Sequence, residues 1–416
     1  MRECQRYAII DWQVERSSDW QEEQMQYREH RDDRLSEIGI GCYALSGVYG
    51  TKDAGQFIGL LRRAYELGVT FFDTADVYGP AEEILGRAVA PFRSRVRLAT
   101  KVGARADGRL DCSAEHVIAS CESSLRRLQT DYLDLYQIHF DDPGTPVEET
   151  VEALEKLEAA GKIRHYGVGH LPLSRMRTYF ATGNVFSALV ELSGAARGAR
   201  DHILPLCRDR GVGVIAFSTA GRGLLTGKIG AGHVFEEGDI RRLDPLFQRE
   251  KFASGLRTAE KFRALGEKHG KTPVQVAIAW VLAQPGIVCA LTGPSTVSHL
   301  EENLGASGWD ISPGDLAELE HFFRDEDGQV RQAQTQAVCA ILAGELRAES
   351  ALTDLVYALE TLVEIEVAGE TEIRALFQRL WGLRGRQDAA TLEQMRALQT
   401  ELRERFSLQL AGGGSR

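Results

Sequence analysis

The sequence predicts an α/β fold, in which parallel strands are joined by helices, followed by an all-α C-terminal extension. Three observations lead to this prediction. Short apolar runs recur through most of the chain, amphipathic segments of helical period separate them, and glycine follows several of these segments. The eight runs fit a (β/α)8 TIM barrel, although an open doubly wound sheet produces the same alternation.

Each predicted strand is a short run of mainly apolar residues that ends close to a glycine or a polar residue. The eight runs comprise residues 37–42, 69–74, 96–101, 132–138, 166–169, 185–192, 213–218 and 288–292.

The segments between these runs have the apolar spacing of helices that pack one face against a sheet. Residues 54–67 show it most clearly, with apolar side chains at spacings of three and four at Phe57, Leu60, Leu61 and Ala64. Residues 146–160 form a second such segment. Gly68, Gly161 and Gly211 each follow a helical segment and precede a strand, so we expect each to have a left-handed conformation.

The strand signals stop near residue 324, and a helical pattern continues to about residue 406. One apolar stripe consists of Leu352, Leu355, Val356, Leu359, Leu362 and Val363, and a second of Ile373, Leu376, Phe377, Leu380 and Trp381. These stripes predict helical hairpins or a small bundle, or helices that simply pack on the preceding part. We therefore divide the chain into an N-terminal extension (1–24), a barrel (25–326) and a helical C-terminal region (327–416).

The composition argues against several classes of protein. The formal net charge is −11, and lysine and arginine are interspersed with acidic residues, so we expect no nucleic-acid partner. The seven cysteines contain no Cys-x-x-Cys pair, which argues against a zinc ribbon or an iron-sulfur site. The apolar patch at residues 7–10 is too short for a signal sequence or a membrane span. We expect a cytoplasmic protein with reduced thiols, no metal and no membrane segment.

Four residues stand at or just after the ends of consecutive predicted strands: Asp73, Tyr78, Lys101 and His139. Singly, each has an ordinary explanation, since such residues often cap helices, form turns or face solvent. Together they occupy the face on which barrel enzymes keep their active sites, which favours the barrel over the open sheet.

The chemistry of these four side chains suits hydride reduction of a carbonyl, which needs a proton donor for the developing alkoxide. We expect Tyr78 to be that donor. Lys101 would bring the pKa of Tyr78, ordinarily near 10, towards neutrality, and Asp73 would pair with Lys101. His139 would donate a second hydrogen bond to the carbonyl oxygen, and Tyr78 would act as a base in the oxidative direction.

At these residues the chain resembles the aldo-keto reductase superfamily. The Asp, Tyr, Lys and His of the family signature match FFDTADVYGPAEEILGRAV, LATKVG and DLYQIHFDDP, and the resemblance runs from about residue 25 to about residue 323. It also covers SEIGIGCYAL, GKIRHYGVG, FSTAGRGLLTGK and LTGPSTVSHLEENL. The resemblance implies a barrel without metal that binds NADP(H) or NAD(H) across the strand ends, and it assigns the four residues the roles argued above.

The resemblance also implies cofactor contacts, position by position. In the loop after the seventh strand, the residues that would wrap the pyrophosphate are Ser218, Gly221, Arg222 and Gly223. The residues that would hold the adenosine end are Thr292, Gly293, Ser295, Glu302 and Asn303.

The chain departs from the family pattern around the nicotinamide. Gly169 and His170 replace the usual Ser-Asn, so we expect His170 to supply one replacement hydrogen bond. The Gln of the amide clamp and the stacking Tyr fall on Leu189 and Leu192, and Leu192 would offer an apolar face. His299 replaces the Arg that often binds the 2'-phosphate, and its charge depends on pH, which leaves the choice between NADPH and NADH open.

These observations predict an NAD(P)H-dependent oxidoreductase that interconverts a carbonyl and an alcohol of an aldehyde, a sugar or a biosynthetic intermediate. Two other readings stay open. The barrel would sense nucleotide while the C-terminal helices dock a protein partner or a second copy of the chain. Alternatively, a tightly held cofactor would be recycled in a reaction with no net redox change.

Overall fold

The computed structural model describes residues 25–47, 53–105, 108–169, 171–365, 367–384, 386 and 388–412. The predicted N-terminal extension, residues 1–24, and His170 lie outside the described residues.

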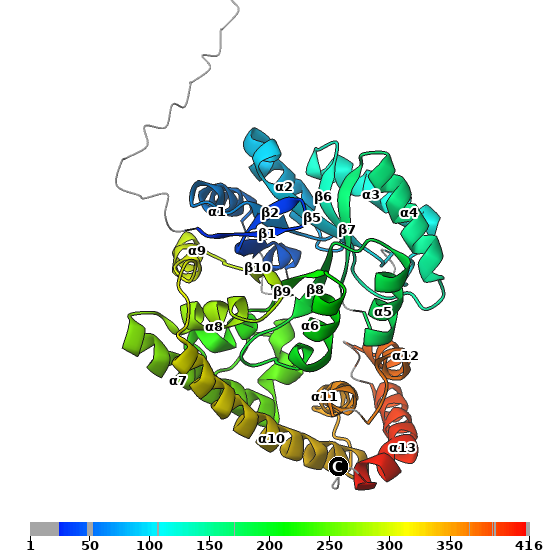
Figure 1. The fold of residues 1–416 in the computed structure, drawn as a ribbon. Helices are drawn as coiled ribbons and strands as arrows, with labels where there is room; N and C mark the ends of the chain where they lie inside the picture. The colour runs from blue at the N-terminus through cyan, green and yellow to red at the C-terminus, as the bar shows by residue number, and fades with distance from the viewer. Residues whose placement is uncertain are drawn as a thin grey trace, which may run out of the picture.

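Eight parallel strands close into a barrel, in the order β10-β3-β4-β5-β6-β7-β8-β9 (Figure 1). The strands are β3 (Ile38–Gly41), β4 (Phe71–Asp73), β5 (Arg97–Val102), β6 (Leu133–Ile138), β7 (Ile163–Gly169), β8 (Ser187–Glu191), β9 (Gly213–Phe217) and β10 (Ile287–Thr292). Each corresponds to one predicted run. Because β10 pairs with β3, the sheet has no free edge, and the predicted (β/α)8 barrel is confirmed over the open sheet.

Helices surround the barrel and separate its strands (Figure 1). They are α1 (Ala54–Glu66), α2 (Ala81–Val89), α3 (Ala114–Leu128), α4 (Val147–Ala159), α5 (Leu173–Thr182), α6 (Ala199–Asp209), α7 (Arg249–His269), α8 (Pro273–Leu282) and α9 (Val297–Leu304). Gly68, Gly161 and Gly211 have φ angles of 92°, 69° and 63°, which confirms the predicted left-handed positions before strands.

Short 3-10 helices occur in the connections of the barrel. They are η1 (Tyr43–Ser46), η2 (Ala90–Arg95), η3 (Gly221–Thr226), η4 (Ile240–Arg242) and η5 (Pro245–Phe247). Three of them, η3, η4 and η5, lie between β9 and α7, so the longest connection of the barrel follows the strand from which the predicted pyrophosphate loop begins.

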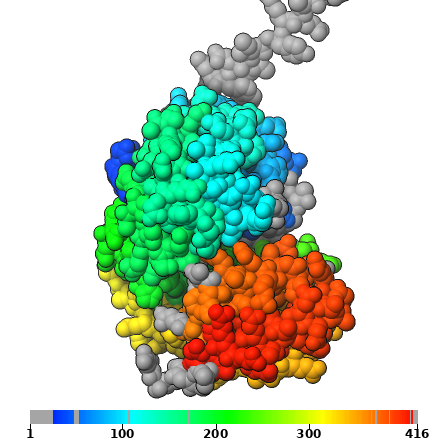
Figure 2. All heavy atoms as spheres, turned by 90° about the vertical axis from the view of Figure 1, so that its right-hand side faces the viewer, coloured from blue at the N-terminus to red at the C-terminus, as the bar shows by residue number. Residues whose placement is uncertain are grey.

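Four helices form the C-terminal part: α10 (Pro313–Ala343), α11 (Ala351–Glu364), α12 (Glu370–Trp381) and α13 (Ala389–Gly412). The two predicted apolar stripes lie on α11 and α12 and contribute to a hydrophobic cluster separate from that of the barrel. Figure 2 shows the later helices, in orange and red, stacked against the barrel. The predicted C-terminal helices are therefore present.

Helix α10 belongs to both parts of the molecule. Leu319 and Phe323, in its first half, are buried in the barrel cluster, whereas Val338 and Leu342 are buried in the C-terminal cluster. The boundary that we place between residues 326 and 327 falls inside this continuous helix. The division into domains remains a prediction.

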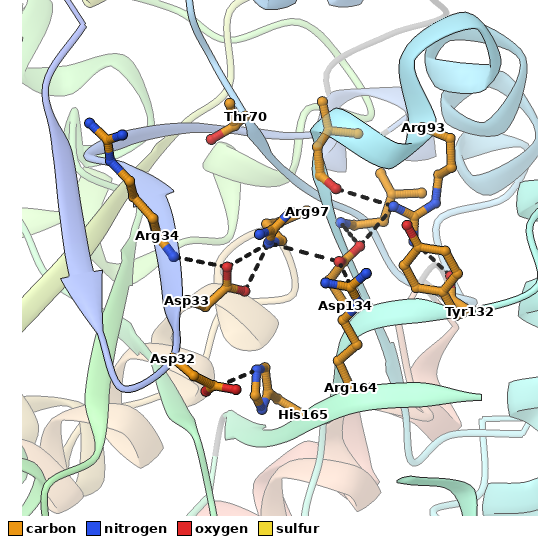
Figure 3. A network of polar contacts seen from close by, with 12 residues as sticks. Asp32, Asp33, Arg34, Thr70, Arg93, Arg97, Tyr132, Asp134, Arg164 and His165 are labelled. Carbon is orange, nitrogen blue, oxygen red and sulfur yellow. Dashed lines mark hydrogen bonds and ion pairs between the residues drawn. The ribbon is translucent and has the colours of Figure 1, made fainter. Parts of the chain in front are cut away.

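A hairpin that the sequence analysis missed closes the amino-terminal end of the barrel. It consists of β1 (Tyr27–His30) and β2 (Asp33–Ser36). Asp33 accepts a hydrogen bond from Arg97 at 2.6 Å, and Arg97 also lies near Asp134 of β6 (Figure 3). Leu35 of the hairpin is buried in the cluster that fills the barrel interior. With this end closed, the carboxyl ends of the strands are left for a functional site.

Candidate active site

The parallel register brings the predicted site residues together at the carboxyl end of the barrel. Asp73 is the last residue of β4 and pairs with Ala99, and Lys101 lies two positions further along β5. His139 follows β6, and its backbone N–H donates to the carbonyl of Val102 at 2.6 Å. Strand pairing alone therefore places these side chains on neighbouring strands of one face.

Lys101 and Asp73 form a buried ion pair, with exposed fractions of 1% and 4%. Lys101 Nζ donates to Asp73 Oδ1 at 2.5 Å and to the Thr74 carbonyl at 2.6 Å. Gln137 of β6 donates to the second oxygen of Asp73, Oδ2, at 3.2 Å. Each carboxylate oxygen thus has a donor, which offsets the cost of burying the charges.

Tyr78 lies in the loop between β4 and α2, against both Lys101 and His139. The Lys101 ammonium is 5.1 Å from the centroid of the Tyr78 ring. The ring of His139 meets that of Tyr78 edge to face, with centroids 5.7 Å apart. The structure therefore gathers all four predicted side chains, while their chemical roles remain a prediction.

The pKa of Tyr78 differs from our expectation. Burial raises it well above the usual value of 10, and the nearby Asp73 carboxylate raises it further. We expected Lys101 to lower this pKa, but its ammonium donates to Asp73 and to Thr74. Burial also raises the pKa of Asp73, although Lys101 and Gln137 oppose this effect. In this arrangement Tyr78 keeps its proton at neutral pH.

Three further residues belong to the site, although sequence reasoning gave them no role. Tyr43 packs on Tyr78 with ring centroids 5.0 Å apart, and Phe140 stacks on His139 at 4.1 Å. Gln137 holds Asp73. Their signal was positional, because each lies within three residues of the carboxyl end of a barrel strand.

The predicted pyrophosphate residues form a tight turn after β9. Ser218, Gly221, Arg222 and Gly223 all have positive φ, at 59°, 58°, 53° and 94°. The hydroxyl oxygen of Ser218 is buried and, among the described residues, has no hydrogen-bond partner. The guanidinium of Arg222 instead contacts Asp244 at 2.6 Å and Glu191 at 3.0 Å.

The residues predicted for the adenosine end gather around the start of α9. Thr292 ends β10, and Ser295 Oγ lies 3.2 Å from His299 Nδ1. Glu302 contacts Lys228, which follows η3, at 3.3 Å. Gly293 directly follows β10, and Asn303 is buried on α9. The two predicted cofactor segments are therefore neighbours in space.

Leu189 and Leu192, the two leucines predicted to lie near the nicotinamide, differ in their surroundings. Leu189 faces the barrel interior, as a clamp residue would. Leu192 is fully buried in the core between the barrel and its helices, so our expectation that it offers an apolar face to the cofactor is wrong. Leu189 and Leu192 are an odd number of positions apart along an extended segment, so their side chains point to opposite faces and cannot both face the cofactor.

Within the described part of the chain, no group of His, Cys, Asp or Glu side chains could hold a metal ion. The described helices likewise include none with the length and apolar character needed to cross a membrane.

Comparison with known proteins gives the following matches. The model of the aldo/keto reductase family matches residues 37–323. The probable aldo-keto reductase 1 of Glycine max is 35% identical over 293 residues, covering 68% of this chain and 84% of the relative. The aldo-keto reductase YhdN of Bacillus subtilis (strain 168) is 34% identical over 295 residues, covering 68% and 88%.

Solved structures match over a similar share of the chain. The glycerol dehydrogenase AKR11B4 from Gluconobacter oxydans superposes with a TM-score of 0.66 at 29% identity, covering 73% of this chain and 95% of that one. The aldo-keto reductase AKR11C1 from Bacillus halodurans gives 0.62 at 26% identity, covering 72% and 96%. The family match ends at residue 323, so most of α10 and all of α11 to α13 lie beyond it.

Proposed function

Because this chain belongs to the aldo/keto reductase family and is therefore an oxidoreductase, we propose that it interconverts a carbonyl and an alcohol with NADP(H) or NAD(H). The observation that supports this proposal best is the convergence of Tyr78, Lys101, Asp73 and His139 at one strand-end face. One of the similar solved structures is named a glycerol dehydrogenase, and this name favours a small hydroxylated substrate for the present chain as well.

The residues that would hold the cofactor fit such a group. The turn at residues 218–223 brings the backbone close to any ligand, and the buried hydroxyl of Ser218 lacks a partner among the described residues. Ser295 and His299 lie at the amino end of α9, where a phosphate is favoured. When bound, the nicotinamide supplies or accepts the hydride.

The chain's own groups handle the proton. In reduction, the Tyr78 hydroxyl donates its proton to the carbonyl oxygen as the C–O double bond becomes a single bond, and His139 donates a hydrogen bond to the same oxygen. Lys101 places a positive charge beside the phenolate that forms, and Asp73 and Gln137 hold Lys101 in position. In oxidation, Tyr78 takes the proton back.

An absorbance assay at the nicotinamide band, with a panel of aldehydes and polyols, tests the proposal. We expect turnover with at least one small hydroxylated carbonyl or its alcohol. Denaturing the purified protein and identifying the released nucleotide completes the test. A nucleotide that stays bound while no member of the panel is turned over would favour a reaction with no net redox change.

The raised pKa of Tyr78 predicts different pH dependences for the two directions. Its phenol stays protonated through neutral pH, so the reductive kcat/KM should change little between about pH 6 and pH 9. Oxidation needs the deprotonated phenol, so the oxidative kcat/KM should rise with pH throughout that range. Initial rates in both directions check this. A reductive rate that falls across neutrality would show that the pKa is lowered in the working enzyme.

His299→Arg should strengthen NADPH binding without changing NADH binding. A guanidinium offers a fixed charge and several donors to a 2'-phosphate, and a hydrogen bond of this charged kind contributes about 1.5–3 kcal/mol, or roughly 10- to 150-fold in affinity. Equilibrium titration of both nucleotides measures the change. His321→Arg, on the exposed surface of α10, is a matched control. An equal gain for both nucleotides would remove residue 299 from the phosphate site.

A further inference from the structure

A cavity of about 770 Å³ lies between the carboxyl end of the barrel and the C-terminal helices. Glu191 at the end of β8, Arg222 after β9 and Asp244 before η5 line the barrel side. Glu360 of α11 and Trp381 of α12 line the opposite side. Its volume falls in the range of roughly 300–1,000 Å³ that is usual for ligand pockets. One wall therefore comes from helices beyond the family match.

The cavity adjoins the proposed catalytic centre. Burial is the main cause of the raised pKa of Tyr43. Arg222 and Asp244, which line the cavity, are close enough for their charges to affect this pKa as well. The Tyr43 ring packs in turn on Tyr78. On the other side, Arg374 of α12 donates to the carbonyl of Asp141, two residues after His139, at 3.4 Å. The four proposed catalytic side chains are not among those that line the cavity, so the cavity is a neighbouring space and not the catalytic centre itself.

The charges that line the cavity balance one another. It has five Arg or Lys and six Asp or Glu side chains. Arg222 pairs with Asp244 and Glu191, and Lys251 pairs with Glu364. Burial raises the pKa of Glu360, one of the other three acids, to about 8, so this carboxyl is mostly uncharged at neutral pH and leaves five charges of each sign. With no net field of one sign, the cavity suits an uncharged ligand beside the predicted pyrophosphate turn better than a second anion or a cation.

The groups that face the cavity suit hydroxyls and a ring. Among the described residues, no hydrogen bond or ion pair involves the Glu360 side chain, so its protonated carboxyl is available as a donor and an acceptor. Phe377 and Trp381 line the same wall and stack on each other, with ring centroids 5.5 Å apart. An apolar aromatic wall beside fixed polar groups is the usual construction of a pocket for a small neutral molecule.

We propose that this cavity is an outer subsite that binds a neutral, hydroxyl-rich ring, such as a sugar, attached to the reacting carbonyl compound. The inference rests on the proposed function, because it takes the carbonyl to be bound at Tyr78. The C-terminal helices then determine specificity, since they supply Glu360, Phe377 and Trp381.

A matched pair of substrates tests the subsite in the full-length chain: 4-hydroxybenzaldehyde and its O-β-glucoside, which differ only in the glucosyl group. Glu360→Ala and Trp381→Ala should each lower kcat/KM for the glucoside by about tenfold, mainly through KM, as expected for the loss of a hydrogen bond or an aromatic contact. For the free aldehyde, kcat/KM should stay within about twofold of the wild type. Glu360→Gln, which keeps an uncharged donor and acceptor, should bind the glucoside nearly as well as the wild type.

Gln378→Ala is the control, because Gln378 is exposed on the same helix as Trp381 and does not line the cavity. Equal losses on both substrates, or no preference of the wild-type protein for the glucoside, would overturn the subsite. Turnover of the free aldehyde reports separately on the proposed function. Should neither aldehyde react, calorimetric titration of the wild-type and Glu360→Ala proteins with the glucoside still decides the matter: equal affinities or no binding would overturn it.

Discussion

Tyr78→Phe should lower kcat for carbonyl reduction by about 10²- to 10⁴-fold, the usual contribution of general acid catalysis. The substitution removes only the transferable proton and the hydroxyl oxygen, and it keeps the ring that packs against His139 and beneath the Lys101 ammonium. Nucleotide affinity should therefore change little. Stopped-flow reduction with saturating cofactor, together with nucleotide titration, separates the two effects.

Tyr43→Phe is the matched control for this experiment. Tyr43 packs on Tyr78, with ring centroids 5.0 Å apart, so it tests whether any nearby phenol suffices. We expect this variant to keep most of its activity. If Tyr78→Phe kept more than about a tenth of the wild-type rate, Tyr78 would not be the general acid.

Lys101→Met should reduce both stability and turnover. The substitution leaves the Asp73 carboxylate buried without its cation, and breaking a buried pair in this way costs about 3–5 kcal/mol of unfolding free energy. Turnover should fall as well, because no positive charge then stabilises the phenolate of Tyr78. Urea denaturation and steady-state kinetics measure the two losses.

The double variant Asp73→Asn with Lys101→Met separates these losses. Removing both charges should restore much of the stability, since no uncompensated charge remains, while turnover should stay low. A Lys101→Met protein as stable as the wild type would mean that water reaches Asp73, and the buried pair described above would then be wrong.

The barrel could be predicted from the sequence because its strands are buried on both faces. Runs such as residues 213–218 and 288–292 are apolar enough to be recognised alone, and β9 and β10 occupy them within one residue. The hairpin β1–β2 was missed because its strands, YREH and DRLS, are mostly polar. Their stability comes from contacts far along the chain, such as Asp33 with Arg97, which no local pattern shows.

The proposed site could be predicted only in part, for a similar reason. Asp73, Lys101 and His139 stand at strand ends, where the topology alone brings them together. The direction of a side chain within that face depends on packing, so the contact of Gln137 with Asp73 and the burial of Leu192 could not be foreseen. The cavity lies between parts of the chain more than a hundred residues apart, and its pairs, such as Lys251 with Glu364, leave no trace in either segment alone.

The length of helix α10 sets the distance between the two hydrophobic clusters. Its 31 residues span about 46 Å at a rise of 1.5 Å per residue, with one end in each hydrophobic cluster. A single inserted residue between Asp327 and Gln334 would turn everything beyond it by about 100°, so Asp327 could keep its pair with Arg197 only if Gln334 lost its contact with Glu364. Descendants of this protein can therefore vary the sequence of α10 far more freely than its length.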